Sequence, residues 1–267
     1  MKQSFQRNRR CARCIALLVL SLAGSGSALR AQSTLPEAPA AQPTPLSLEE
    51  RPSILGTPKR ILLDEVHVFE SPAQIRMHDL AWLLPVAGAT AAGFATDTYT
   101  MRNVVSRNPD FNTAATTSSD VLRGMFIGVP VLLFGTGELA HQQKPREAGL
   151  LAGEAMVDGY ITSEAIKYIT LRERPYQQNA RGHFFQSDAV SDPSFVSGHT
   201  IVAWSSAAVL ASEYPRPWQQ IGIYTLASGV SLTRVLGQDH FPTDALLGSV
   251  SGWLIGRYVY KSHHHRR

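Results

Sequence analysis

Cysteine is almost absent from this chain. Among 267 residues only Cys11 and Cys14 occur, and both lie close to the amino terminus. A Cys-x-x-Cys spacing can indicate metal or redox chemistry, but this pair stands in a basic segment without a second half-site. We therefore expect neither a structural disulfide nor a cysteine-based site.

Long hydrophobic runs are also scarce. The longest charge-free runs within candidate helices are 80–96 and 217–233, whereas a membrane-spanning helix needs about 20 mostly apolar residues. Charged residues also interrupt the candidate helix at 146–171, namely Glu154, Asp158, Glu164 and Lys167. Such charges could instead face a polar bundle interior. The short apolar runs and the charged residues favour a soluble or peripherally attached domain. A membrane-spanning bundle remains the alternative.

Residues 1–31 have the composition of an export signal. Five basic residues without an acidic one precede the apolar run 15–22, and the small-residue stretch 25–31 follows, so we expect cleavage near Ala28 or Ala31. Removing six positive charges would change the formal net charge from +4 to −2. The basic pI of about 9.2 is then no argument for a nucleic-acid partner. We expect an exported protein of the periplasm or cell envelope.

The segments at both ends of the remaining chain differ from a folded domain. Residues 32–60 are rich in proline, alanine and small polar residues, which predicts a disordered or extended linker. Residues 263–267 form a basic, histidine-rich tail that we expect to be solvated rather than a metal site. One catalytic domain, 61–262, lies between them.

This domain has helical periodicity and little strict alternation of apolar and polar residues. Six candidate helices are Met77 to Thr98, Ser119 to His141, Arg146 to Leu171, Gly198 to Tyr214, Trp218 to Leu236 and Thr243 to Tyr260. Ser118, Ser119 and Asp120 suit the start of the second, and Pro215 and Pro217 would end the fourth. Gly248, Gly252 and Gly256 form a row of small residues that allows close helix contact. The predicted fold is all-α, a bundle of about six helices with the active site at one rim.

Three short clusters in the last hundred residues carry the candidate chemistry. The first contains Lys167 and Arg174, whose spacing of seven residues is almost two helical turns. Pro175 disfavours a helical conformation at Arg174, which we expect to begin a loop folding back toward the site. The alternative reading is a solvated basic helix end.

The second cluster is Ser197-Gly198-His199, directly before an apolar helix. A hydroxyl, free backbone amides and the positive end of a helix dipole suit an oxyanion such as phosphate, and Gly198 allows close approach. His199 could act as a general acid because imidazole titrates near neutrality. Alone, the cluster also fits an ordinary cap beside a surface histidine.

The third cluster contains Arg234, His240 and Asp244. The four-residue spacing lets the Asp244 carboxylate accept from one imidazole nitrogen of His240 and leave the other free to attack. Arg234 adds a guanidinium suited to an oxyanion. A structural histidine–aspartate cap is the alternative, and we interpret Asp239 as a solvated loop residue.

In order and spacing these clusters resemble the signature of the type-2 phosphatidic acid phosphatase and vanadium haloperoxidase superfamily. That signature has Lys, six residues and Arg-Pro; then Pro-Ser-Gly-His; then Ser-Arg, five residues, His, three residues and Asp. Here Val196 replaces the proline and Thr233 replaces the serine. Neither change removes a charged or proton-transferring group, so the differences concern turn geometry rather than chemistry.

The resemblance implies a helical phosphatase. His240 would be the nucleophile that forms a phosphohistidine, Asp244 would orient it, and His199 would protonate the leaving group. Lys167, Arg174, Ser197, Gly198 and Arg234 would bind the phosphoryl oxygens. No cofactor and no metal are expected, because fixed cations and helix termini can stabilise the developing charge. The substrate would be a phosphate monoester or pyrophosphate: a lipid phosphate, an isoprenoid pyrophosphate or a small soluble ester.

Three other functions remain open on sequence. A vanadium-dependent haloperoxidase could use the same residues, with vanadate as its cofactor. A phosphotransferase would pass the phosphoryl group to an alcohol or lipid. A non-catalytic phosphate-binding module of the envelope would retain binding alone. Membrane contact is compatible with each of them.

Overall fold

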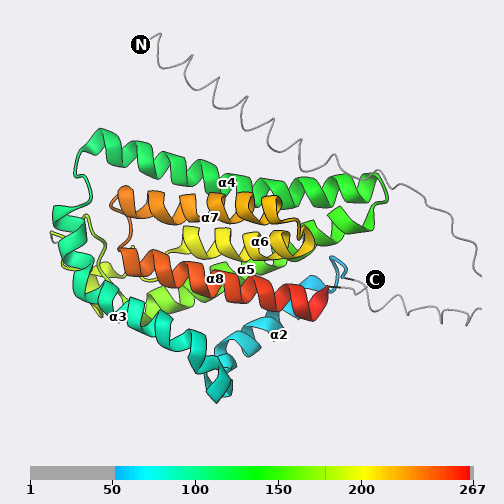
Figure 1. The fold of residues 1–267 in the computed structure, drawn as a ribbon, viewed down its shortest axis with the longest axis horizontal. Helices are drawn as coiled ribbons and strands as arrows, with labels where there is room; N and C mark the ends of the chain where they lie inside the picture. Colours follow the sequence, from blue (N-terminus) through cyan, green and yellow to red (C-terminus); the bar gives the residue numbers. More distant parts are fainter. Residues whose placement is uncertain (1–51, 178, 265–267) are drawn as a thin grey trace, which may run out of the picture. The chain divides into compact units, whose positions relative to one another are not determined.

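The computed structural model describes residues 52–177 and 179–264, and in these residues every regular element is a helix. Seven α-helices occur there: α2 (Thr57–Glu70), α3 (Leu80–Asn103), α4 (Pro109–Leu139), α5 (Gln143–Thr170), α6 (Gly198–Glu213), α7 (Pro217–Leu236) and α8 (Pro242–His263) (Figure 1). The predicted all-α fold is confirmed, and each of the six expected helices is present. The expected export signal and most of the expected linker lie outside the described residues.

Helix α6 forms the centre of the bundle. Most of its residues are buried, and it contacts α4, α5, α7 and α8. Its apolar side chains, such as Ile201 and Val209, are fully buried with Leu151 of α5 and Val230 of α7. Burying a side chain of this size contributes roughly 1.5–3 kcal/mol. This core fixes the helix ends that meet at the rim of the bundle.

The glycine row of α8 lies against the backbone of α6. A Cβ atom at Gly248 would lie 3.1 Å from the Ser197 carbonyl oxygen, and one at Gly252 would lie 3.0 Å from the Trp204 Cβ. Gly256 likewise faces the Ser205 carbonyl oxygen. The expected close helix contact is therefore present, between the last helix and the central one.

Helix α4 begins earlier than the sequence predicted. The expected start at residues 118–120 is wrong, because Asn108 already caps the helix: its Oδ1 accepts from the amides of Asp110, at 2.9 Å, and Phe111, at 3.2 Å. Pro109 occupies the first turn, where a missing N–H costs nothing. Asp120 therefore lies within the helix, where its side chain can reach a neighbouring element.

Both ends of the expected domain extend further than predicted. Helix α2 begins at Thr57, inside the stretch assigned to the linker, and packs against α5. His263 closes α8 and lies 2.8 Å from Asp64 of α2, while His264 lies 2.9 Å from Glu147. These two histidines are thus packed rather than part of a solvated tail. Residues 265–267 lie outside the described residues.

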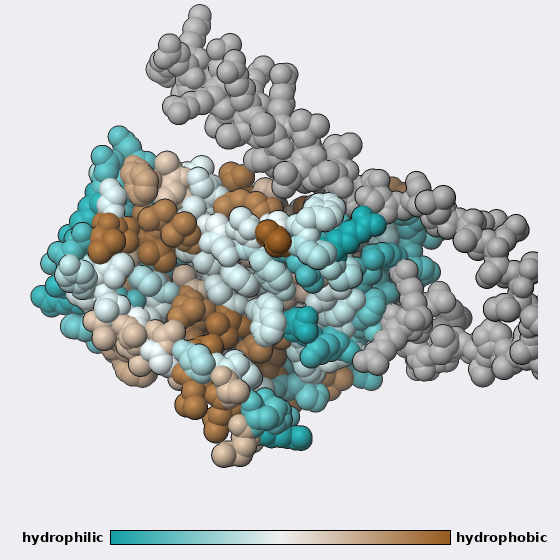
Figure 2. Space-filling model, in the orientation of Figure 1, coloured by the Kyte–Doolittle hydropathy of each residue, from teal (hydrophilic) through white to brown (hydrophobic). Residues whose placement is uncertain are grey.

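Apolar side chains also cover much of the outer surface. Within the described residues, α4 is the one helix long and apolar enough to cross a membrane, and most of its apolar stretch is not buried in the protein. Figure 2 shows further apolar side chains gathered over α3 and the adjoining face of α8. Trp82 and Leu84 of α3 are 40% and 65% exposed. A surface of this kind is suited to contact with lipid.

Candidate active site

The three predicted clusters meet at one end of the bundle. Four helix ends come together there: the C-terminal ends of α5 and α7 and the N-terminal ends of α6 and α8 (Figure 1). Helix α5 ends at Thr170, so Arg174 lies in the loop that the following proline predicted. Arg174 Nη1 lies 3.4 Å from His240 Nε2 and donates to the Asp239 carbonyl oxygen at 3.0 Å. The first and third clusters are thus in direct contact.

His240 is almost completely buried beside Asp244 and Ser194. Its Nδ1 lies 3.6 Å from Asp244 Oδ2, slightly beyond hydrogen-bond distance, and 3.4 Å from Ser194 Oγ. Ser194 Oγ in turn donates to Asp244 Oδ2 in a short hydrogen bond. The predicted histidine–aspartate pair is therefore present, with a serine hydroxyl that the sequence did not indicate lying against both.

The contact with Arg174 identifies the tautomer of His240. A guanidinium can only donate hydrogen bonds, so Nε2 must carry the lone pair and Nδ1 the proton. The carboxylate of Asp244 favours the same tautomer because it attracts the Nδ1 proton. Nε2 is thus the ring nitrogen that keeps a lone pair.

Asp244 is held from the other side by Arg172. The Arg172 guanidinium donates to Asp244 Oδ1 at 2.5 Å and to Asp97 Oδ2 of α3 at 2.7 Å. It lies over the Phe241 ring, 4.1 Å from its centroid. Asp97 also accepts from the Thr243 amide at 3.2 Å. Four side chains thus fix the first turn of α8, and sequence reasoning did not single out Arg172 or Asp97.

Arg234 approaches the site from the end of α7. Its Nη1 lies 3.2 Å from Asp239 Oδ2, which also accepts from Thr116 Oγ1 at 2.8 Å. Asp239 was interpreted as a solvated loop residue, and this interpretation is wrong because it pairs with Arg234. The buried Nε of Arg234 has no hydrogen-bond partner in the described part of the chain. That donor is available to an anion.

The start of α6 lies next to Lys167. A Cβ atom at Gly198 would lie 3.2 Å from Lys167 Nζ, so the glycine allows the ammonium group to approach the first turn of the helix. Ser197 occupies the cap position, and its amide donates to the Asp244 carbonyl oxygen at 3.2 Å. Lys167 also pairs with Glu164 at 2.7 Å. The second cluster is thereby joined to the first and the third.

His199 points toward α4. Its Nε2 lies 2.9 Å from Asp120 Oδ1. Arg123, one turn further along α4, lies close enough to lower the pKa of His199, as does Arg234. The sequence proposed Asp120 only as part of a helix start, so its pairing with His199 is a further partner that spacing did not reveal.

The surroundings of His199, His240 and Asp244 determine which of these three side chains are charged near neutral pH. Burial, Arg234 and Arg123 together lower the pKa of His199 to about 4. Burial is also the main cause that lowers the pKa of His240 to about 3. Burial alone would raise the pKa of Asp244, but the neighbouring imidazole of His240 and the charge of Arg172 hold it below the ordinary value. At neutral pH both imidazoles are thus uncharged and Asp244 is an anion.

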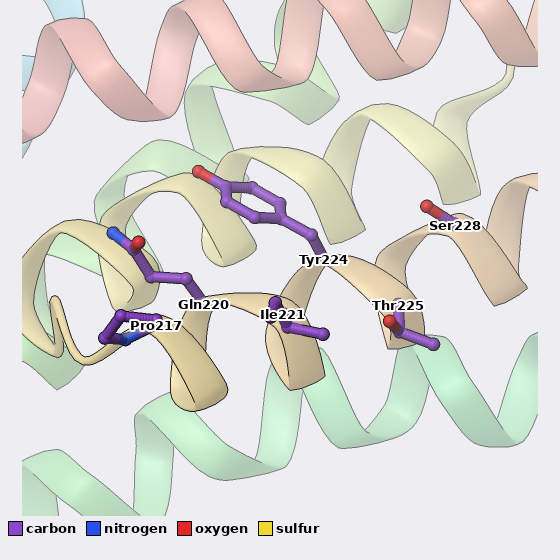
Figure 3. Close-up of a pocket in the computed structure, with 6 residues that line it drawn as sticks. All are labelled: Pro217, Gln220, Ile221, Tyr224, Thr225 and Ser228. Atoms are coloured by element: carbon purple, nitrogen blue, oxygen red, sulfur yellow. The ribbon is translucent and has the colours of Figure 1, made fainter.

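Two of the grooves formed by the described residues lie along α7. The first runs along the N-terminal half of α7, lined by Ile221 and Tyr224 among others, and contains none of the predicted site residues (Figure 3). The second, of about 800 Å³, lies between α3, α6, α7 and α8 and is lined mainly by apolar side chains. Pro242, two residues from His240, lies at this second groove. The apolar groove therefore adjoins the rim where the clusters meet.

Comparisons with known proteins agree with the motifs. The model of the PAP2 superfamily matches residues 148–267. Among curated proteins the chain is similar to the lipid A 1-phosphatase of Porphyromonas gingivalis, with 33% identity over 110 residues that cover 40% of this chain and 22% of that protein. The chain thus spans less than a quarter of that relative's length.

Two solved structures are also similar. Aquifex aeolicus LpxE aligns with a TM-score of 0.43 and 20% identity, covering 61% of this chain and 92% of that one. The first transmembrane PAP2 type phosphatidylglycerolphosphate phosphatase from Bacillus subtilis aligns with a TM-score of 0.48 and 19% identity, covering 79% of this chain and 100% of that one.

Proposed function

We propose that this chain is a phosphatase of the PAP2 superfamily, whose model matches residues 148–267, and that it hydrolyses a phosphorylated lipid through a phosphohistidine intermediate. The observation that carries the proposal is the buried His240, whose Nε2 lone pair faces Arg174 while Asp244 and Ser194 lie at Nδ1. A neutral imidazole oriented by a carboxylate is a competent nucleophile toward phosphorus.

The first step forms one bond and breaks another. His240 Nε2 attacks phosphorus, the bond between phosphorus and the leaving oxygen breaks, and His199 gives its proton to that oxygen. Asp244 stabilises the positive charge that develops on the His240 ring. The proton on His199 has to be acquired when substrate binds, because its pKa of about 4 leaves it neutral in the free protein near pH 7.

The second step regenerates the enzyme. Neutral His199 accepts a proton from water, the water oxygen attacks phosphorus, and the bond between phosphorus and nitrogen breaks to release inorganic phosphate. Arg174, Arg234 and Lys167 would stabilise the phosphoryl oxygens throughout, with the amide of Gly198. Since fixed cations supply the charge stabilisation, the proposed reaction needs no metal ion.

Two features support a lipid as the substrate. The apolar groove beside Pro242 begins at the rim and is lined by Trp82, Leu246 and Trp253, so it could hold a hydrocarbon chain while the phosphate lies among the cations. The relative from Porphyromonas gingivalis is named for a lipid substrate, lipid A. We also propose that the protein acts at a membrane of the cell envelope, where its exposed apolar surface would contact lipid.

The decisive test is chemical trapping of the intermediate. With phosphatidic acid labelled in its phosphate and EDTA present, rapid acid-free quenching should recover labelled wild-type protein whose phosphate is labile to acid, as phosphohistidine is. His240→Asn should release no phosphate and retain no label. His183→Asn, which changes an exposed histidine of the neighbouring loop, is the matched control and should behave as wild type.

Other outcomes would change the assignment. Phosphate release by folded His240→Asn at a near-normal rate would refute the nucleophile. Bromide oxidation by peroxide after loading with vanadate, without phosphate release from any ester, would indicate a haloperoxidase instead. Binding of phosphate without turnover of lipid or soluble substrates would indicate a binding module.

A further inference from the structure

A second cluster of ionisable side chains lies far from the active site. Asp64 of α2, Glu154 of α5 and His263 at the end of α8 each offer a ligand atom, and these atoms lie within 4.8 Å of one another. Figure 1 shows the C-terminal end of α8 beside α2, at the opposite end of α8 from His240. Along α5 the cluster is about 20 Å from Lys167.

Two of the three ligand groups are fully buried, and His263 is half-buried. Asp64 and Glu154 are each only 1% exposed. The Arg60 guanidinium binds both oxygens of Glu154, at 2.8 and 2.7 Å, and His263 Nε2 lies 2.8 Å from Asp64 Oδ2. These contacts arrange the ligand groups before any ion binds.

One further carboxylate in this region has no partner. Asp158, one turn after Glu154 on α5, is fully buried, and neither of its oxygens has a hydrogen-bond partner among the residues that the structure describes. It lies close enough to Asp64, Glu65 and Glu154 that their charges add to burial and raise its pKa to about 8. A buried polar group without a partner requires a compensating contact.

Carboxyl groups outnumber basic side chains around the cluster. Four carboxyl groups converge there, Asp64 and Glu65 from α2 with Glu154 and Asp158 from α5. Among the described residues that the contacts place against them, Arg60 is the permanent cation, and His263 adds a second charge only when protonated. A dication would stabilise the ionised forms of these four carboxyl groups more completely than the two side chains do.

We propose that Asp64, Glu154 and His263 bind a divalent transition metal ion, with Zn²⁺ as the best fit and Asp158 as an additional oxygen ligand or nearby countercharge. Zinc accepts both carboxylate oxygen and imidazole nitrogen at about 2.0–2.2 Å. Mixed nitrogen and oxygen ligands are less suited to Mg²⁺, which prefers an octahedral shell of oxygens. Glu154 can keep Arg60 on one oxygen while the other binds the ion.

The site would have a structural role. Its ligands come from three helices, so an ion bound there would fasten α2 and the end of α8 to α5. It takes no part in the proposed hydrolysis, which needs no metal. Loss of the ion should therefore loosen the N-terminal helix without removing any group that contacts phosphate.

The test measures metal content and thermal stability of the full-length chain. After EDTA treatment, addition of Zn²⁺ and dialysis to remove unbound metal, we expect one Zn²⁺ per chain by mass spectrometry of the metal. The midpoint of unfolding should rise by about 5 °C or more once free zinc is 100 times its dissociation constant. Mg²⁺ at the same concentration should give a much smaller shift.

Three variants separate this site from binding elsewhere. Asp64→Asn and His263→Ala should each lose the bound zinc and the shift. His264→Ala, which changes the adjacent histidine bound to Glu147, should keep both and so exclude binding by the histidine tail. If His263→Ala fails to fold, zinc binding by Asp64→Asn is the deciding measurement, because asparagine has nearly the same size as aspartate. No zinc uptake by wild type, or full uptake by folded Asp64→Asn, would overturn the proposal and leave an ion-pair network.

Discussion

Arg172 Nη1 donates a hydrogen bond to Asp244 Oδ1 at 2.5 Å, and the two side chains are 3% and 0% exposed. The same guanidinium binds Asp97, so one cation compensates two buried carboxylates. Arg172 contacts no reacting atom. Its role in the proposed reaction is to position the carboxylate that orients His240.

Arg172→Lys is expected to lower kcat about 100-fold while KM changes little, because lysine keeps the charge but cannot bind Asp97 and Asp244 together. Steady-state kinetics with a soluble phosphate ester would measure this, and circular dichroism would confirm that the variant folds. Arg181→Lys, at an exposed position of the neighbouring loop, should leave kcat unchanged. A folded Arg172→Lys with normal kcat would contradict the positioning role.

The parts of the candidate site that were predicted correctly are those that depend on the spacing of residues close together in the sequence. The four residues from His240 to Asp244 and the proline after Arg174 define geometry within one or two turns, so these parts of the site are found where expected. The Arg172–Asp97 pair joins residues 75 positions apart. Such pairing depends on how helices pack, and nothing near either residue signals it.

Helix boundaries also divide into those that nearby residues determine and those that depend on packing in the folded bundle. Pro215 and Pro217 separate α6 from α7 as predicted, because proline acts locally. Only the first turn of α2, residues 57–60, was assigned to the linker, because the stretch that ends there is rich in proline, and α2 packs against α5 in the folded bundle. Asp239 was misread in part because one of its partners, Thr116 of α4, lies 123 positions away in the sequence.

The second prediction concerns proton uptake. His199 is neutral in the free protein above about pH 4, because burial and two arginines disfavour its charged form. A bound phosphate anion offsets Arg234 and Arg123, so the pKa of His199 should rise and the protein should take up a proton. Between pH 4 and the pKa in the complex, binding therefore strengthens as pH falls.

Calorimetry in two buffers of different ionisation enthalpy would measure this uptake. Near pH 5.5, wild type should take up about one proton more than His199→Asn on binding inorganic phosphate. Because both proteins bind the same phosphate, the difference between their proton uptakes does not contain the protonation of phosphate itself. Asp120→Asn should reduce the difference, since Asp120 favours the charged imidazole. Equal uptake by wild type and His199→Asn would exclude His199 as the protonated group.

The third prediction tests the apolar groove. Val250 lines it, and tryptophan at this position would fill part of the space between α3 and α8. Val250→Trp should lower kcat/KM for long-chain phosphatidic acid about 10-fold, with little effect on a short soluble phosphate ester. Ile221→Trp, in the groove of Figure 3, is the matched control and should affect neither substrate. Equal losses on both substrates would mean that Val250→Trp disturbs the rim rather than lipid binding.

The glycine row gives a prediction about stability. A Cβ atom at Gly252 would press on the α6 backbone at Ile201 and lie 3.0 Å from the Trp204 Cβ, whereas one at Gly222 of α7 would meet nothing within 4 Å. Gly252→Ala should therefore lower the free energy of unfolding by about 1–3 kcal/mol. Gly222→Ala should raise it by roughly 0.5–1 kcal/mol, because alanine loses less backbone entropy in a helix. Denaturant titration would measure both, and equal stability of the two variants would show that α6 and α8 do not pack closely at Gly252.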